Sequence, residues 1–311
     1  MILKTRHPNA ASEHNLDLPK RENISCPLCK EDKSHQKYQI KSWTIVQCTR
    51  CQFVYVNPRL QKEELLKIYT SNYFNNRQVG YYRYTESKKL RKKNFQKWIT
   101  DTLPYFEQHA SVKALDVGCA AGYCLEVFQE QQWKAYGVEL DKDFVYNLQQ
   151  KGFTIFNTPL TQLNTTEKFD LISLFDVVEH LTDLQENMAI LRSLLKDSGV
   201  IVFITPNYES WQRKLFQKKW FQFKPVEHIS YFSKKTLQRL ANDNGFEIAY
   251  SKASGQFCDM FFLGNRLKKY GFHFLHPLFR ITVKLFNLQN KSFYVDTASL
   301  YVILKKKQPY K

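Results

Sequence analysis

The chain has 311 residues, 43% of them hydrophobic, and a formal net charge of +17 at neutral pH. This length fits one full α/β domain with a smaller module and allows a sizeable core without disulfides. The sequence has no run of about 18 uncharged apolar residues and no apolar segment near its start, so we expect neither a membrane-spanning nor a secreted protein but a cytoplasmic one.

The positive charge is distributed unevenly along the chain. From Met260 to the end there is one acidic residue, Asp296, against ten Lys or Arg residues. Two further basic runs lie at 88–93 and 213–219. Such clusters are typical of contacts with phosphate, nucleic acid or anionic lipid, and also of a solvated surface that aids solubility.

The first third of the chain has three parts. Residues 1–22 lack apolar periodicity and are predicted to form a disordered lead-in. Residues 23–60 are predicted to form a small module, with short strands at 43–46 and 53–56. Residues 61–110 follow a helical pattern rich in Tyr, Lys and Arg, and are predicted to form a helical connector.

The small module contains two Cys-x-x-Cys pairs with 18 residues between them. This spacing is typical of two metal knuckles that present four thiolates to one tetrahedral Zn²⁺. A redox pair instead opens a helix after a strand and does not occur as a matched second copy. We therefore predict a zinc ribbon with a structural Zn²⁺ bound by Cys26, Cys29, Cys48 and Cys51. The other cysteines are scattered in apolar-rich segments, which suits a reducing cytosol.

From residue 111 onward, strand patterns alternate with helix patterns. This alternation is typical of a Rossmann-like, doubly wound α/β fold with a mostly parallel sheet, here of seven strands. The expected strands are 112–117, 135–139, 154–156, 169–175, 200–205, 246–251 and 299–304, and the expected helices are 123–131, 143–151, 183–195 and 234–244. An aromatic and basic insertion at 256–291 separates the last two strands of this domain, which spans 111–311.

The first strand of the domain ends in Asp116 and leads into a glycine-rich turn, Gly118 to Gly122, at the start of a helix. Such a turn lets a ligand approach the backbone and exposes helix N-terminal N–H groups. The turn lacks the G-x-G-x-x-G fingerprint, so nicotinamide binding is disfavoured. Glu139 ends the next strand about 20 residues later, where an acid accepts hydrogen bonds from ribose hydroxyls. Turn and acid together predict a nucleoside site.

With these residues the chain resembles the class I S-adenosylmethionine-dependent methyltransferases, whose first motif reads L-D-V-G-C-G-x-G. The resemblance covers 111–255, including the segments at 169–180, 195–199 and 227–233. It is similar in particular to the ubiquinone-biosynthesis-type O-methyltransferases, and the cysteine module followed by 53–59 is similar to the amino-terminal module of a bacterial subgroup. The resemblance implies methyltransferase activity with S-adenosylmethionine as the methyl donor.

The resemblance also implies which residues bind the cofactor. Asp116 and the backbone from Gly118 to Gly122 would hold the methionine end, and Glu139 the ribose. The whole expected cofactor site is Asp116, Gly118, Cys119, Ala120, Gly122, Glu139, Leu140, Leu160 and Phe175, the last three flanking the adenine and the sulfonium. Ala120 stands where the family has glycine. If this position needs a positive φ, alanine costs about 1 kcal/mol and lowers affinity without abolishing binding.

Methyl transfer is a direct displacement, and a hydroxyl acceptor also needs a base to remove its proton. His180 and His228 follow the fourth and fifth strands, at the carboxyl edge of the sheet, and each is a candidate base or a loop-capping residue. If one is the base, the rate should rise through a pKa near that of histidine. Asp176, Glu179 and His180 also resemble the set that binds a divalent metal in ubiquinone-biosynthesis O-methyltransferases, although a structural turn is favoured over Mg²⁺.

The insertion mixes apolar side chains with Lys and Arg at helical spacing over 257–288. This pattern suits an interfacial helix at a membrane surface, a hydrophobic lid over a lipid-like acceptor, or a helical pair packed on the sheet. We expect an O-methyltransferase for a small-molecule, glycan or lipid-linked acceptor, in the cytoplasm or peripheral at the inner membrane surface. The alternatives are an RNA methyltransferase and a non-catalytic zinc-ribbon protein with a degenerate methyltransferase fold. The sequence indicates no oligomeric state.

Overall fold

The structure is a computed structural model, and it describes residues 19–70, 87–107, 109, 111–289 and 291–308. Most of the lead-in predicted to be disordered therefore lies outside the described residues. For its last residues the prediction of disorder is wrong, because β1 (Arg21–Glu22) pairs antiparallel with β5 (Arg59–Leu60). The Arg59 guanidinium donates to Glu22 at 2.9 Å and holds the two short strands together.

The cysteine module folds around three antiparallel strands, β2 (Ser34–Ile40), β3 (Trp43–Cys48) and β4 (Val54–Val56). We call residues 23–60 the ribbon. Its sheet has a fourth strand, β11 (Ser230–Tyr231), which comes from the far end of the chain and pairs with β4. The ribbon therefore shares a sheet with a segment of the larger domain.

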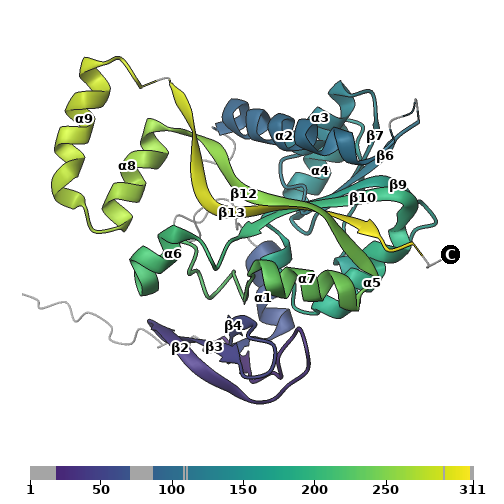
Figure 1. Cartoon of the computed structure of the whole chain (residues 1–311). Coiled ribbons are helices and arrows are strands. Elements are labelled where there is room, and N and C mark those ends of the chain that lie inside the picture. The colour runs from purple at the N-terminus through teal and green to yellow at the C-terminus, as the bar shows by residue number, and fades with distance from the viewer. Residues whose placement is uncertain (1–18, 71–86, 108, 110, 290, 309–311) are drawn as a thin grey trace, which may run out of the picture.

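Two helices follow the ribbon, α1 (Lys62–Thr70) and α2 (Lys88–Thr102), with a single turn of 3-10 helix after them at Leu103–Tyr105. The part of the predicted connector between them lies outside the described residues. In Figure 1, α1 lies between the ribbon and the large sheet, and α2 packs beside α3 (Tyr123–Glu130).

The large sheet has seven strands in the order β12-β13-β10-β9-β6-β7-β8. Neighbouring strands are parallel except at β13, which runs antiparallel to both β10 and β12. The predicted Rossmann-like, mostly parallel seven-stranded sheet is thus confirmed. The strands are β6 (Lys113–Val117), β7 (Lys134–Val138), β8 (Thr154–Phe156), β9 (Phe169–Phe175), β10 (Leu195–Pro206), β12 (Phe246–Asp259) and β13 (Ser292–Lys306).

Helices cover both faces of this sheet. In Figure 1, α2, α3 and α4 (Lys142–Gln150) lie on one face, and α5 (Leu184–Leu194) and α7 (Lys234–Asp243) lie on the other. The short helix α6 (Trp211–Phe216) follows β10, and 3-10 turns lie at Leu160–Gln162, Val178–His180 (η5), Gln217–Lys219 and His273–Leu275.

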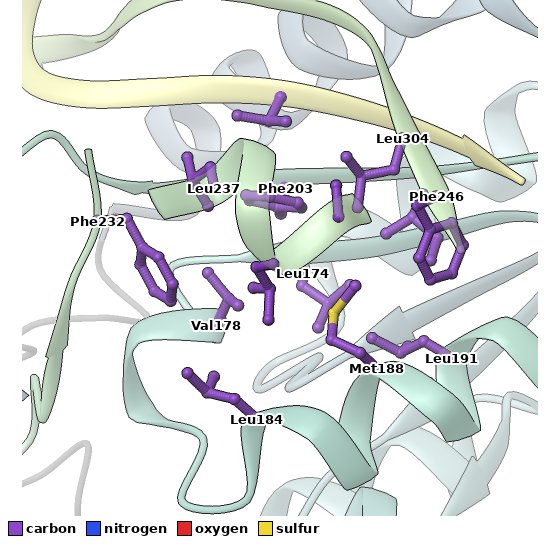
Figure 2. Packing of buried hydrophobic residues seen from close by; sticks show 14 of the residues in the cluster. Leu174, Val178, Leu184, Met188, Leu191, Phe203, Phe232, Leu237, Phe246 and Leu304 are labelled. Carbon is purple, nitrogen blue, oxygen red and sulfur yellow. The ribbon is translucent and has the colours of Figure 1, made fainter. Parts of the chain in front are cut away.

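One apolar face of α5 packs against the large sheet and forms part of the core. Leu184, Met188 and Leu191 recur at the i, i+4, i+7 spacing of one helix face, and Figure 2 shows them beneath Leu174 of β9 and Phe203 of β10. Each such side chain contributes about 1.5 to 3 kcal/mol when it is fully buried. The same hydrophobic cluster continues through Phe232 to Cys26, Phe53 and Tyr55 of the ribbon, so the ribbon and the large sheet share one core.

Several predicted boundaries are wrong at the edge of the sheet. β10 begins at Leu195, because 196–199 continue the strand across a register shift instead of forming a turn. β12 and β13 extend well beyond 246–251 and 299–304, so the first residues of the predicted insertion belong to β12. Backbone pairing over the whole length of this hairpin explains the extension.

The hairpin of β12 and β13 carries α8 (Met260–Lys269) and α9 (His276–Leu285) beyond the body of the domain (Figure 1). No residue of α9 is buried. α9 is therefore not packed on the sheet, whereas α8 begins at the buried Met260 and contacts β12. No helix of the described ranges is long and apolar enough to cross a bilayer.

Candidate active site

The strand order reverses between β6 and β9, and doubly wound folds bind ligands at the carboxyl ends of strands at such a point. The predicted functional side chains gather there. Asp116 lies near the end of β6, Glu139 follows β7, and Asp176 follows β9. The parallel pairing of β6 with both neighbours brings these three strand ends to one edge.

The glycine-rich turn after β6 depends on a left-handed backbone. Gly118 and Gly122 have φ of 74° and 78°. A Cβ atom at Gly118 would lie 2.8 Å from Val177 Cγ2, and one at Gly122 would clash with Leu148 Cδ2, so a side chain at either position would be strained and crowded. Ala120 also has a positive φ, 46°, so the expected strain of about 1 kcal/mol applies there.

Glu139 holds this turn against the end of the next strand. Its Oε2 accepts the backbone N–H of Ala120 at 2.7 Å, and its Oε1 accepts those of Leu140 and Asp141 at 2.7 and 2.8 Å. Burial raises the pKa of this carboxyl, and the three N–H donors act in the opposite direction by stabilising the carboxylate. The acid expected to bind ribose is therefore positioned by the turn itself.

Asp116 lies beneath the turn. Its Oδ1 accepts a hydrogen bond from Ser173 Oγ at 2.6 Å, and its side chain is buried. Burial raises the pKa of Asp116 to about 7. Asp116, Cys119 and Gly122 do not line the cavity at this edge, whereas the other six predicted cofactor residues do.

The cavity has a volume of about 240 Å³. The predicted residues that line it are Gly118, Ala120, Glu139, Leu140, Leu160 and Phe175. A further part of the wall comes from α1, α2 and β12. It consists of Lys62, Leu65, Leu66, Tyr69, Arg91, Asn94, Phe95, Trp98 and Gln256. The sequence signals for this part were indirect: the helical, Tyr-rich pattern of the connector, the basic run at 88–93 that includes Arg91, and the insertion that begins at Gln256.

Three aromatic side chains that line the cavity pack against one another. The ring centroids of Phe95 and Trp98 on α2 lie 5.6 and 5.1 Å from that of Phe175 at the end of β9. Contacts of this kind are typical of tilted aromatic packing, and they make this wall apolar. An aromatic face near a positively charged sulfonium is also electrostatically favourable.

Of the two candidate bases, His180 lines the cavity and His228 does not, but their ring centroids lie 4.9 Å apart. Nδ1 of His180 lies 2.9 Å from the Glu227 carbonyl oxygen, and Nδ1 of His228 lies 2.9 Å from the Gln222 carbonyl oxygen. A carbonyl only accepts, so each Nδ1 carries a proton and each Nε2 is the basic atom of a neutral ring.

Burial sets the charge of His180. Desolvation, with the nearby charge of Lys224, lowers the pKa of His180 to about 3, so the ring is neutral across the physiological range. If His180 is the base, we therefore no longer expect the rate to rise through an ordinary histidine pKa. Its Nδ1 also lies 2.9 Å from the Tyr69 hydroxyl of α1.

Glu179 completes a group of three. It is fully buried, and its Oε2 accepts from Thr205 Oγ1 at 3.1 Å. Its Oε1 has no hydrogen-bond partner in the described part of the chain and lies 4.0 Å from His180 Nε2. Desolvation raises the pKa of Glu179 well above its usual range. One ligand atom each of Glu179, His180 and His228 lie within 4.8 Å of one another.

The residues that come together differ from the divalent-metal ligands that the resemblance implied, Asp176, Glu179 and His180. Asp176 is not among the described groups that come together, and His228 takes its place beside Glu179 and His180. Asp176 instead has a φ of 55°, and burial raises its pKa to about 6. Sequence adjacency suggested Asp176, whereas the turn after β9 and the segment after β10 bring in His228.

The four cysteines of the ribbon gather as predicted. Sγ atoms of Cys26 and Cys51 lie 3.5 Å apart, and those of Cys29 and Cys48 lie 3.6 Å apart. A tetrahedral zinc ion with Zn–S bonds of about 2.3 Å separates its sulfur ligands by about 3.8 Å. The Cys51 N–H also points to Cys48 Sγ at 3.5 Å, which suits a thiolate acceptor. The residues present therefore fit a structural zinc ion.

The ribbon and α1 hold the loops that carry the two histidines. The Val56 N–H donates to the Ile229 carbonyl at 3.0 Å, one residue after His228. Arg59 donates to the Thr182 carbonyl at 2.8 Å, two residues after His180. Lys62 of α1 forms an ion pair with Asp183 at 3.0 Å. The amino-terminal part thus borders the site directly.

Sequence comparisons identify relatives of the central region. A family model described as a methyltransferase domain matches residues 87–251. The ubiquinone biosynthesis O-methyltransferase of Histophilus somni is 30% identical over 128 residues, covering 35% of this chain and 53% of that protein. The enzyme of the same name from Methylococcus capsulatus is 22% identical over 178 residues, covering 50% and 75%. The chain thus spans about half the length of the Histophilus relative.

Solved structures with a similar fold include two methyltransferases. The 1,6-didemethyltoxoflavin-N1-methyltransferase of Burkholderia thailandensis, solved with 1,6-didemethyltoxoflavin and S-adenosylhomocysteine, has a TM-score of 0.50 at 13% identity, covering 89% of this chain and all of that one. A methyltransferase from Archaeoglobus fulgidus has a TM-score of 0.48 at 20% identity, covering 72% and 100%. At such identities the likeness to the Burkholderia structure shows the fold alone.

Proposed function

Because the chain belongs to the methyltransferase-domain family and is a class I S-adenosylmethionine-dependent methyltransferase, we propose that it methylates a hydroxyl group of a small-molecule, glycan or lipid-linked acceptor. The observation that carries this proposal is the neutral His180, which lines the cavity with Nδ1 bound to a backbone carbonyl and has His228 beside it. The curated relatives are themselves named as O-methyltransferases.

On this proposal the cofactor occupies the side of the cavity formed by the turn. Glu139 accepts hydrogen bonds from the ribose hydroxyls while its backbone contacts keep it in place. Leu140 and Leu160 flank the adenine, and Phe175 faces the sulfonium. Asp116 contributes negative charge from beneath the turn to the methionine end.

The acceptor then approaches from the side of α1 and α2, with its oxygen in line with the S–CH₃ bond. The O–CH₃ bond forms as the S–CH₃ bond breaks, and the hydroxyl proton passes to Nε2 of His180 or His228. A histidine with a pKa as low as that of His180 does not ionise a free hydroxyl in advance. Proton transfer therefore accompanies the displacement, when the attacking oxygen has become acidic.

The same trio has a second candidate role as a divalent-metal site. Oε1 of the buried Glu179, which has no hydrogen-bond partner in the described part of the chain, favours this role, as does the presence of ligand atoms of His180 and His228 within 4.8 Å of the Glu179 carboxylate. Two imidazoles and one carboxylate suit a transition metal better than Mg²⁺. A bound ion would act as a Lewis acid toward the acceptor hydroxyl. Metal titration monitored by the absorption spectrum of Co²⁺ would test this role directly.

An RNA acceptor is the alternative function, and the first basic run does not favour it. Lys88 and Lys92 of α2 form ion pairs with Glu126, and Lys92 also pairs with Glu130. Lys93 lies over the ring of Phe257. These three lysines are engaged with their own chain and do not form an open stripe for phosphates.

The proposal is tested by labelled methyl transfer. Incubating the protein with methyl-labelled S-adenosylmethionine and separated cell fractions should label the small-molecule, glycan or lipid fraction, and mass spectrometry should locate the added methyl on oxygen. The Glu139→Ala variant serves as the control for cofactor-dependent labelling. Label confined to the RNA fraction, with binding that weakens steeply as salt increases, would establish the alternative.

A further inference from the structure

The helices α8 and α9 form a small hairpin of their own. Phe279 of α9 packs against α8 at Gly264, where a Cβ atom would lie 3.2 Å from the Phe279 ring. Phe279 and Val283, one helical turn apart, are partly buried, so this side of α9 faces inward. Figure 1 shows both helices beyond the sheet, at the tip of the β12–β13 hairpin.

The opposite side of α9 is apolar and exposed. Leu278, Ile281 and Leu285 recur at i, i+3 and i+7, and their exposed fractions are 62%, 55% and 76%. Phe274 and Phe286 extend the surface at the two ends of the helix, with exposed fractions of 74% and 68%. We call these five residues the outward face. A contiguous apolar surface of this kind marks an interaction site.

The charge around the outward face is uniformly positive. The 36 residues from 260 to 295 include no acid. Arg280 and Lys284 are exposed and lie one helical turn apart, and Lys284 follows Ile281 at i+3, so the two bases border one side of the outward face. Lys268 of α8 is also exposed. Among the described residues, none of these three bases has an acidic partner within salt-bridge distance.

We propose that the outward face docks on the surface of an anionic lipid bilayer. Its apolar side chains enter the boundary between headgroups and acyl chains, and Arg280 and Lys284 meet lipid phosphates. The aliphatic residues of the outward face and the bases beside them fit this boundary. A nucleic acid would contact the bases but leave Leu278, Ile281 and Leu285 in water.

The hairpin of α8 and α9 is connected directly to the wall of the cavity, so docking would affect where the cavity lies relative to the bilayer. β12 leads to α8 directly from the cavity wall, since Gln256 lines the cavity. The next residue, Phe257, is held by Asn94 of α2, whose side chain accepts its N–H at 2.6 Å and donates to its carbonyl at 3.2 Å. Docking would therefore bring the cavity near the bilayer. The inference does not depend on the hydroxyl acceptor proposed above.

Vesicle flotation of the full chain tests the inference. The protein should float with phosphatidylcholine vesicles that contain phosphatidylglycerol, and bind them less as salt increases. Replacing Leu278, Ile281 and Leu285 together by Ser should abolish flotation. Replacing Arg280 and Lys284 by Gln should lower affinity by about fivefold per base. The matched control is Leu215→Ser, an exposed leucine on α6, which should float like the unchanged protein.

Calorimetry with S-adenosylmethionine separates this inference from the proposed function. Every variant should bind the cofactor like the unchanged protein, because α9 does not line the cavity. The inference is overturned if the unchanged protein does not float, or if the triple Ser variant floats equally well. It is also overturned if sedimentation shows a dimer that the triple Ser variant converts to a monomer, since a second copy then covers the face.

Discussion

The Tyr69 hydroxyl lies 2.9 Å from Nδ1 of His180, and the two rings meet edge to face. This contact joins α1 to the turn after β9, across 111 positions of sequence. Burial raises the pKa of Tyr69 well above its usual range, so the hydroxyl keeps its proton. A helix that precedes the methyltransferase domain thus helps to orient one of its candidate bases.

Replacing Tyr69 by Phe should lower kcat about 2- to 10-fold without changing the affinity for S-adenosylmethionine. The substitution keeps the ring and removes one hydrogen bond, whose net contribution is about 0.5 to 1.5 kcal/mol. Steady-state kinetics with labelled cofactor would measure kcat, and calorimetry the affinity. Tyr146→Phe, on the exposed side of α4, is the matched control. Equal losses of kcat and cofactor affinity would mean that Tyr69 supports the fold of the site as a whole.

Replacing His180 or His228 by Ala should lower turnover about 10²- to 10⁴-fold and leave cofactor affinity nearly unchanged, since a base acts in the transition state. The exposed His35 of β2 provides the control as His35→Ala. If both single variants keep near-normal turnover on the true acceptor, neither histidine is the base. Positioning of the acceptor by the cavity must then account for the rate.

Replacing Glu139 by Ala should weaken S-adenosylmethionine binding by about 1.5 to 3 kcal/mol, because hydrogen bonds from the ribose to a carboxylate would be lost. The loss also frees the Ala120 N–H that holds the turn. Calorimetry on a variant shown to be folded by circular dichroism is the measurement. Glu247→Ala, at an exposed position of β12, should bind the cofactor normally. An unchanged dissociation constant in Glu139→Ala would remove this residue from the site.

Affinity for S-adenosylmethionine should fall as the pH is lowered through 7. Burial raises the pKa of Asp116 to about 7, so its charge disappears below that pH. The cofactor is positively charged at its amino group and sulfonium, and it favours the ionised carboxylate. In the limit where only this form binds, affinity drops about tenfold per pH unit below the pKa. Calorimetry at several pH values should show this slope in the unchanged protein and a shallower one near pH 7 in Asp116→Asn, where Glu139 and Asp176, whose pKa values burial also raises, remain.

The ribbon should contain one equivalent of Zn²⁺ per chain, held by the four gathered thiolates. Elemental analysis of protein prepared without chelator measures it. Cys48→Ser should lose the metal and unfold at a lower temperature, whereas Cys258→Ser, which changes a buried thiol outside the cluster, should keep it. Zinc-free protein from such a preparation would disprove the assignment.

The sequence predicted those parts of the fold that local patterns determine. β8 and β9 have the predicted bounds, because each is a short apolar run between polar turns. The start of β10 was missed, since Lys-Asp-Ser-Gly has the composition of a turn and only its partner strand keeps it extended across the register shift. The long ends of β12 and β13 likewise depend on their pairing with each other.

The same distinction applies to the site. Glu139 was predicted because an acid at a strand end is visible locally, whereas its three backbone partners were not. Tyr69 was not predicted, because nothing near it in sequence indicates a partner on the far side of the domain. The sequence suggested Asp176 as the neighbour of Glu179 and His180, whereas the structure places His228 there. This could not be predicted, because it depends on how the segment after β10 folds back.

The pairing of β4 with β11 limits how the ribbon can be separated from the rest of the protein, in evolution and in engineering. A fragment that lacks residues 1–60 would leave β11 without its partner strand β4. Phe232 would also lose its packing against Phe53 and Tyr55. Open edges of this kind recruit other chains and aggregate. The ribbon is therefore structurally part of the larger domain and cannot be removed without exposing β11. A transplant of the catalytic part into another scaffold, or an exchange of ribbons between relatives, succeeds only where the two sides of this strand pair are carried together.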